Sequence, residues 1–206
     1  MSTVAIIDYK LCNLHSVAAG VVKCGHTPVI TDRAEEMRHA THLILPGVGS
    51  FGDAMTNIRN AGIDAAIREL VVEKQYPLLG ICLGMQLLAT KGYEGGETEG
   101  LNLIAGEVRR LEPKEKSERI PHIGWNQVHI VKDSPLLKDI PTDNDFYFVH
   151  SYALQCKDRN AVVAETPYCS SFASVVENGN VFGTQFHPEK SQKLGLKLLE
   201  NFLTYC

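Results

Sequence analysis

The amino-acid sequence predicts an α/β fold, in which a mostly parallel central sheet carries helices on both faces and an antiparallel β region is added in the second half. Two observations lead to this prediction. Residues 1–90 alternate short, almost continuously apolar segments with helical patterns, as the strands of a covered parallel sheet and their connecting helices do. After Lys91, strand-like segments follow one another with few helices between them.

The first half is expected to supply four parallel strands. They are expected at residues 4–7, 28–31, 42–45 and 77–81, with Pro46 ending the third. Asn13, a good N-cap residue, is expected to begin a helix that runs to Cys24, with Gly25 in the C′ position. A helical pattern over residues 53–72 is interrupted near Gly62, and Met85–Thr90 begins another helix.

The second half is expected to consist mainly of strands. They are predicted at residues 103–111, 120–131, 145–155, 161–165, 172–176 and 181–185. Asn178-Gly179 between the last two is a strong hairpin signal. A final helix, capped by Ser191, places apolar side chains on one face at Leu194, Leu198, Leu199, Phe202 and Leu203. No linker or repeat interrupts the chain, so a single domain over residues 1–206 is expected, with the charged run Glu112–Arg119 as a solvated loop.

Composition and charge exclude several classes of protein. Twenty Lys and Arg against 24 Asp and Glu leave a formal charge of −4, which excludes a broadly basic nucleic-acid binder. No stretch approaches the roughly 20 apolar residues of a membrane span, and the N-terminus lacks the basic region of a signal peptide. The six cysteines contain no Cys-x-x-Cys pair, so we expect reduced thiols and a cytoplasmic protein without nucleic-acid or membrane partners.

The segment Gly80-Ile81-Cys82-Leu83-Gly84 is the sharpest local feature, because it joins a buried strand to a helix. A nucleophile on such a turn needs small neighbours, and the helix N-terminus behind it favours a thiolate. The N–H of Leu83 is then placed to donate into an oxyanion hole. Taken by itself, the pattern also fits a buried cysteine that acts as a small apolar residue.

A base for such a thiol is available in Phe186-His187-Pro188-Glu189, at the end of a predicted strand. In an extended segment, His187 and Glu189 point to the same side, so Glu189 can fix the tautomer of the imidazole. A structural histidine is the alternative interpretation.

Two further patterns are weaker. Gly47–Gly52 formally matches G-x-G-x-x-G, but Pro46 precedes it and the acid that follows at Glu69 lies in a helical pattern, so no dinucleotide cofactor is expected. His187-x-Glu189 resembles half of a zinc-deaminase signature without the Pro-Cys-x-x-Cys that completes it, so no metal is expected.

At these motifs the sequence resembles the class I glutamine amidotransferases, and within them the glutaminase subunits of imidazole glycerol phosphate synthase. The segments that carry the resemblance are Pro46–Gly49, Gly80–Gln86, Pro121–Asn126, Phe148–Tyr152 and Gln185–Ser191. They occur in order along the whole chain. The resemblance implies a flavodoxin-like fold and hydrolysis of glutamine to glutamate and ammonia.

The same resemblance implies a role for each matching residue. Cys82 attacks the side-chain amide, His187 acts as base and then acid, and Glu189 orients it. The oxyanion donors are Leu83 and the Gly47–Val48 region, a loop that family members hold in an unproductive orientation until the partner is loaded. The glutamine α-groups are expected to contact Gly49, Gln86, Glu94, Ser151 and Tyr152.

The implied partner is the (β/α)8-barrel cyclase, or synthase, subunit, bound as a heterodimer. It receives the ammonia and makes imidazole glycerol phosphate and aminoimidazole carboxamide ribonucleotide in histidine biosynthesis. The expected interface residues are Asn13, His122, Trp125, Asn126 and Lys190, with Trp125 near the mouth of the ammonia passage.

One segment departs from the family pattern. Lys10 and Cys12 stand in Asp8–Asn13 where the family usually has glycines, on the active-site side of the sheet. The departure leaves open a paralogous glutaminase that serves a divergent synthase in surface-sugar biosynthesis. A stand-alone cysteine hydrolase and a non-enzymatic module with a structural cysteine are two further alternatives, independent of this segment.

Overall fold

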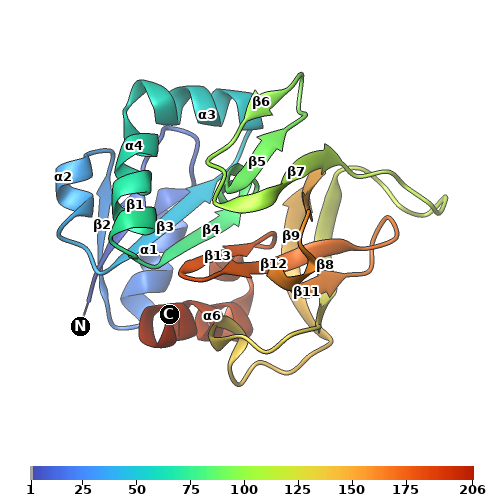
Figure 1. Ribbon diagram of the computed structural model, residues 1–206. Coiled ribbons are helices and arrows are strands. Elements are labelled where there is room, and N and C mark those ends of the chain that lie inside the picture. The colour runs from blue at the N-terminus through green and yellow to red at the C-terminus, as the bar shows by residue number, and fades with distance from the viewer. Residues whose placement is uncertain (1) are drawn as a thin grey trace.

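A parallel sheet forms the centre of the molecule (Figure 1). The structure is a computed structural model that describes residues 2–206. Its parallel strands are β1 (Thr3–Ile7), β2 (Thr27–Thr31), β3 (His42–Gly47), β4 (Leu78–Cys82) and β13 (Val181–Thr184). Their order is β2-β1-β3-β4-β13, which is the flavodoxin-like order with β13 in the fifth place. The predicted fold class is confirmed.

Antiparallel strands extend this sheet beyond β13. They are β12 (Phe172–Asn178), β11 (Val162–Thr166), β8 (His122–Ile130) and β9 (Asn144–His150), which complete a nine-stranded sheet. The predicted hairpin joins β12 to β13, with Gly179 at a φ of 60° in its turn. A separate four-stranded sheet consists of β10 (Tyr152–Cys156), β7 (Ile104–Arg110), β5 (Ala89–Gly92) and β6 (Thr98–Glu99).

Helices cover both faces of the parallel strands because alternate side chains of each strand point to opposite faces. On one face, α1 (Leu14–Lys23) and α6 (Gln192–Tyr205) pack against a cluster that includes Val4, Ile6 and Ile44. The other face holds Ala5, Ile7 and Leu43 beneath the remaining helices and the small sheet (Figure 1). Those helices are α2 (Ala34–Met37), α3 (Phe51–Asn60), α4 (Ile63–Ile67) and α5 (Leu83–Leu87), with a π-helical turn at Arg68–Glu73.

Three predicted strand or helix boundaries are wrong. β3 continues through Pro46 to Gly47. Pro46 has no backbone N–H to donate, but β1 pairs with β3 only as far as Ile44, so no hydrogen bond to β1 is lost at Pro46. The helix predicted over residues 85–90 ends at Leu87, and β5 follows because its residues pair with β7. The strand predicted over residues 145–155 is interrupted at Ser151, since β9 and β10 belong to different sheets.

The two predicted helix caps lie at the right positions but do not act through their side chains. Asn13 and Ser191 occupy the N-cap positions of α1 and α6 without a capping hydrogen bond. The Ser191 hydroxyl instead donates to the carbonyl of His187 at 2.7 Å and accepts from the N–H of Tyr147 at 3.0 Å. Ser191 therefore anchors the His187 segment to β9.

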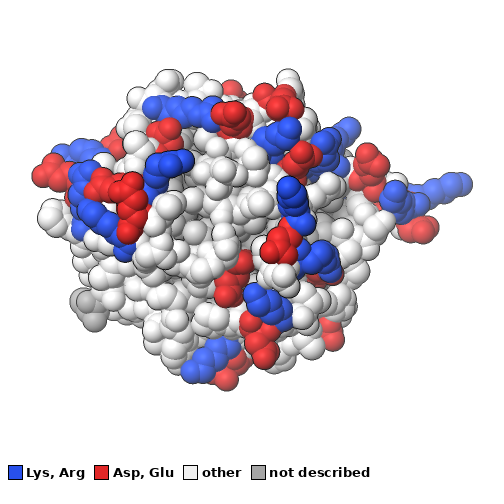
Figure 2. Space-filling model, in the orientation of Figure 1, with Lys and Arg blue, Asp and Glu red and all other residues white. Residues whose placement is uncertain are grey.

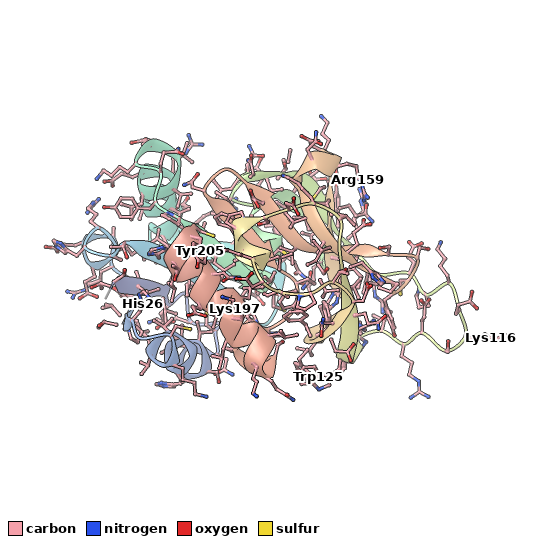
Figure 3. The ribbon with its side chains drawn as sticks, turned by 90° about the horizontal axis from the view of Figure 1, so that it is seen from below. His26, Lys116, Trp125, Arg159, Lys197 and Tyr205 are labelled. Atoms are coloured by element: carbon pink, nitrogen blue, oxygen red, sulfur yellow. The ribbon has the colours of Figure 1, made fainter. Side chains whose placement is uncertain are left out.

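The surface carries both signs of charge side by side, as Figure 2 shows for one face. The Glu112–Arg119 segment is largely exposed, and Lys116 lies at the tip of a loop that projects from the body (Figure 3). Within residues 2–206 there is no helix with the length and apolar character of a membrane span.

The contact between α6 and the His187–Lys190 segment depends on the absence of a side chain at Gly195. A Cβ atom there would overlap the carbonyl oxygen of Pro188. We expect Gly195→Ala to lower the free energy of unfolding by about 1–3 kcal/mol. The matched control is Gly52→Ala in α3, where the nearest atom would be 3.6 Å away and the substitution should raise that free energy by roughly 0.5–1 kcal/mol. Urea denaturation measures both, and equal effects would contradict the assignment.

Candidate active site

Cys82 lies on a sharp turn where β4 passes directly into α5. Its backbone has φ 55° and ψ −110°, a conformation that a residue with a side chain rarely adopts. Such strain costs about 1–3 kcal/mol and persists only where the surrounding structure enforces it. The predicted strand-to-helix turn is therefore present, with the thiol at its apex.

Two glycines allow the turn to close. A Cβ at Gly84 would overlap the carbonyl oxygen of Leu45 in β3, and a Cβ at Gly80 would lie 2.7 Å from the carbonyl oxygen of Gly84. Helix α5 consequently packs directly on the backbone of β3 and β4. The N–H of Leu83 stands at the start of this helix, where no preceding turn supplies an acceptor for it.

His187 and Glu189 form a buried pair next to this turn. The Nδ1 atom of His187 lies 2.8 Å from Oε1 of Glu189, and the two side chains are only 3% and 1% exposed. Glu189 lies in a 3-10 turn (Pro188–Lys190), so the extended geometry predicted for this segment is wrong although the contact itself forms. Because a carboxylate accepts, Nδ1 carries the proton and Nε2 is the ring nitrogen that remains for proton transfer.

The surroundings of His187 favour its protonated form. Burial lowers the pKa of His187, but the interactions with Cys82 and Glu189 together outweigh it and raise the pKa to about 9. Among residues 2–206, neither Nε2 of His187 nor Oε2 of Glu189 has a hydrogen-bond partner. The thiol of Cys82 instead contacts the carbonyl oxygen of Val149 at 3.7 Å and Nε2 of Gln185 at 3.8 Å. In this conformation the thiol and the ring of His187 lie near each other without a hydrogen bond between them among the described residues.

A cavity of about 240 Å³ opens beside the thiol, a volume suited to a small metabolite. It brings together eight of the residues that the sequence indicated: Val48, Gly49, Cys82, Leu83, Gln86, Glu94, Ser151 and Tyr152. Val149 and His150 complete the lining and were missed, although both lie inside the Phe148–Tyr152 motif. A larger cavity of about 460 Å³, lined by residues such as Arg110 and Phe172, contains none of these groups.

Two polar side chains that line the cavity each have one terminal atom hydrogen-bonded to the protein. Gln86 donates through Nε2 to the carbonyl of Tyr152 at 2.8 Å and to Oε1 of Gln185 at 3.2 Å. Glu94 accepts at Oε2 from the N–H of Phe51 at 2.8 Å. Each therefore keeps one oxygen, Oε1, for a ligand in the cavity.

The second predicted oxyanion donor is turned away from the cavity. The N–H of Val48 donates to the carbonyl of Leu11 at 2.8 Å. In this conformation the N–H of Val48 is therefore not available to a ligand in the cavity, and the role of Gly47–Val48 in an oxyanion hole stays a prediction. Rotation of the Gly47–Val48 peptide is needed to bring this N–H to the thiol.

The Asp8–Asn13 segment lies against that loop. Lys10 has a φ of 73°, a value that glycine adopts without strain, and its ammonium group pairs with Asp8 at 3.0 Å and Asp32 at 3.2 Å. The thiol of Cys12 donates to the carbonyl of Pro46 at 3.3 Å. Of the two departures from the family pattern, Cys12 contacts the segment next to the predicted oxyanion donor, whereas Lys10 pairs with Asp8 and Asp32.

The predicted partner residues divide into two groups. Trp125 is 47% exposed and projects from β8 (Figure 3), Lys190 lies with its ammonium group 5.9 Å from the ring of Tyr147, and Asn13 is exposed. His122 was expected at the same surface, but it is only 3% exposed because it faces the core side of β8. Asn126 is half-buried and contacts His122.

No group of three or more His, Cys, Asp or Glu side chains in the described part of the chain is arranged to hold a metal ion.

Comparisons with known proteins extend over almost the whole chain. The family model for glutamine amidotransferase class-I matches residues 5–206. A protein of Campylobacter jejuni (strain RM1221) named imidazole glycerol phosphate synthase subunit HisH 1 is 48% identical over 200 residues, covering 97% of this chain and 98% of that protein. The Moorella thermoacetica protein named imidazole glycerol phosphate synthase subunit HisH is 48% identical over 202 residues, with 98% and 94% coverage.

Among solved structures, PurLQS from Thermotoga maritima superposes with a TM-score of 0.75 at 20% identity, covering 100% of this chain and 99% of that chain. A structure described as glutamine amidotransferase superposes with a TM-score of 0.73 at 19% identity, covering 98% and 99%. These two likenesses concern the fold. Together with the family match over residues 5–206, the sequence relatives place the chain: it belongs to the class I glutamine amidotransferase family.

Proposed function

We propose that this chain is the glutaminase subunit of an imidazole glycerol phosphate synthase, and that it hydrolyses glutamine to glutamate and ammonia for histidine biosynthesis. The observation that carries the proposal is the strained turn that places Cys82 in the lining of a metabolite-sized cavity and next to the buried His187–Glu189 pair. The printed names of the full-length relatives support the same function.

In the proposed reaction, the proton of Cys82 passes first to Nε2 of His187, whose raised pKa favours this transfer, and the sulfur then attacks the δ-carbonyl carbon of glutamine. The N–H of Leu83 stabilises the oxyanion, and His187 protonates the departing ammonia. A thioester remains, and water activated by His187 releases glutamate. Glu189 holds the Nδ1–H tautomer throughout, which keeps Nε2 directed at the reacting atoms.

The cavity supplies partners for the α-amino and α-carboxylate groups of glutamine. We assign the amino group to the free oxygens of Gln86 and Glu94 and to backbone carbonyls near Ser151 and Tyr152. Gly49, with a φ of 114°, brings backbone close to the ligand on the opposite wall. This arrangement suits an amino acid bound at its main-chain end with its amide directed at Cys82.

The orientation of Val48 supports dependence on a partner. With only Leu83 available as an oxyanion donor, the isolated chain is expected to turn over slowly. The partner we propose is a barrel-shaped cyclase subunit, bound as a heterodimer at the surface around Trp125, Tyr147 and Lys190. We further propose that residues 1–206 form one amidotransferase domain and that the complex works in the cytoplasm.

The test is glutamate release from glutamine by the purified chain, alone and with a cognate cyclase and its nucleotide ligand. We expect activity mainly in the loaded complex, because binding of the loaded partner must turn the Val48 N–H into the cavity. Removal of one oxyanion donor typically costs about 10²–10³-fold in turnover, which sets the expected stimulation. Full activity of the isolated chain would instead support a stand-alone hydrolase.

Replacement of the nucleophile distinguishes the glutaminase activity from the synthase activity of the complex. We expect Cys82→Ala to abolish synthesis that depends on glutamine while synthesis from added ammonium salt continues, because ammonia bypasses the thiol. Cys24→Ala, which removes a thiol that contacts the carbonyl of Leu196 in α6, is the control and should retain both activities. Glutamine-dependent synthesis by the Cys82→Ala complex would contradict the assignment of the nucleophile.

Replacement of the orienting carboxylate tests the raised pKa of His187. In Glu189→Gln, the carboxylate that raises the pKa of His187 is absent, while burial still lowers it. The pKa of His187 should therefore fall from about 9, as NMR titration would show. Because the folded-state pKa lies above the unfolded value of about 6.5, protonated His187 stabilises the fold fully below pH ~6.5. That stabilisation is lost as the pH rises through about 9.

Wild type should therefore lose stability relative to Glu189→Gln as the pH is raised from about 6.5 to 9, which urea denaturation at each pH measures. We also expect glutaminase turnover to fall by about 10²–10⁴-fold in this variant. Glu73→Gln removes an exposed carboxylate in the Arg68–Glu73 turn and should change neither quantity. An unchanged His187 pKa in Glu189→Gln would contradict the role given to the carboxylate.

A further inference from the structure

A row of hydrogen bonds runs behind the cavity through two histidines that the proposed reaction does not use. Nδ2 of Asn126 lies 3.2 Å from Nε2 of His122, and Nδ1 of His122 lies 3.0 Å from Nε2 of His150. Nδ1 of His150 in turn lies 2.8 Å from the carbonyl oxygen of Tyr152. The two rings are 3% and 6% exposed, and they sit directly opposite each other in the β8–β9 pairing.

The chemistry of the two ends fixes the direction of the whole row. A carbonyl oxygen only accepts, so Nδ1 of His150 carries a proton. Burial lowers the pKa of His150 to about 3 and that of His122 to about 4, so each ring is neutral near pH 7 and carries a single proton. Nε2 of His150 therefore accepts from Nδ1–H of His122, and Nε2 of His122 accepts from the amide of Asn126.

The first member of the row is oriented independently. Oδ1 of Asn126 accepts from the backbone N–H of Gln127 at 2.8 Å, which leaves the NH₂ group facing His122. Every polar atom between Asn126 and Tyr152 thus has one assignment, with the donors all pointing toward the cavity. Buried networks that are fully satisfied in this way define one conformation.

The row ends where the backbone changes sheets. β9 ends at His150, β10 begins at Tyr152, and the two strands belong to different sheets. His150, Ser151 and Tyr152 all line the cavity of about 240 Å³, and the Tyr152 carbonyl also accepts from Gln86. The imidazole of His150 therefore holds a backbone segment that no single sheet holds on both sides.

We propose that His122 and His150 are positioning residues for glutamine, which fix the 150–152 backbone through a hydrogen-bond row of single direction that begins at Asn126. The inference rests on the proposed function, because it assigns the α-groups of glutamine to that backbone. It also gives a role to His122 and Asn126 that does not require either side chain to reach a partner. Trp125, exposed between Gly124 and Asn126 on the same strand, lies next to the start of the row.

The deciding variant is Asn126→Asp, which changes one NH₂ group into an oxygen and retains the acceptor for Gln127. Facing a carboxylate, His122 must place a proton on Nε2. If each ring keeps one proton, Nδ1 of His122 becomes an acceptor, the tautomer of His150 reverses, and Nδ1 of His150 meets the Tyr152 carbonyl lone pair to lone pair. The hydrogen bond that is lost is therefore the one between His150 and the Tyr152 carbonyl at the cavity, at the far end of the row from residue 126.

We expect this variant to raise the KM for glutamine about tenfold in the loaded complex while kcat changes less than threefold, since the binding backbone and not the thiol is displaced. Nitrogen-15 NMR of the histidine rings should show Nε2–H tautomers in place of Nδ1–H. The matched control is Gln127→Glu, which adds the same charge one residue away on an exposed side chain and should leave KM and both tautomers unchanged.

Three results would overturn the inference. The first is an unchanged KM in Asn126→Asp with reversed tautomers. The second is a raised KM with His122 doubly protonated, because a cationic ring keeps its Nδ1–H donor and the direction of the row. The third is an unchanged KM in a folded His122→Phe variant, which keeps the aromatic stack on Tyr168 at 4.1 Å but removes both nitrogens. If the wild-type complex does not hydrolyse glutamine, the proposed function is wrong and the inference is wrong with it. The histidine tautomers of the wild type are measured without substrate, so that measurement does not depend on the proposed function.

Discussion

The backbone of Cys82 is the constraint on which the rest of the site depends. A residue with a side chain held at φ 55° is stable only if its neighbours leave it no alternative. Here they are the carbonyl of Leu45 and the backbone of Gly80 and Gly84, in contacts too close for any added Cβ atom. The central sheet must therefore be fully packed before the thiol has a defined position.

Parallel topology then gathers the other groups around this point. β4 lies between β3 and β13, so the carboxyl ends of both neighbours reach the same edge as Cys82. β3 delivers Gly47 and Val48, and the chain beyond β13 delivers His187. Segments more than one hundred residues apart in sequence, such as Cys82 and His187, meet because binding sites of open α/β sheets form at the carboxyl ends of strands. The antiparallel extension adds His150 to the far wall, and the separate four-stranded sheet adds Tyr152.

The sequence predicted the features that local chemistry determines and missed those set by distant contacts. The Cys82 turn follows from its glycines, and the Asn178-Gly179 hairpin follows from its turn residues. By contrast, β5 forms only because β7 lies beside it, and Ser151 divides a continuous β pattern because its two halves join different sheets. The burial of His122 and the turned-away N–H of Val48 likewise depend on partners, His150 and Leu11, that no local pattern identifies.

Burial of the remaining thiols has a practical consequence for the chemistry of the whole chain. Of the six free cysteines, Cys12 and Cys156 have pKa values raised by burial to about 11, and burial raises that of Cys206 to about 12. Burial also raises the pKa of Cys24 and of Cys169. Since alkylating agents and peroxides react with thiolates, burial lowers the reactivity of these five positions toward both near neutral pH. Labelling of the native protein at these five positions is accordingly expected to require an alkaline pH.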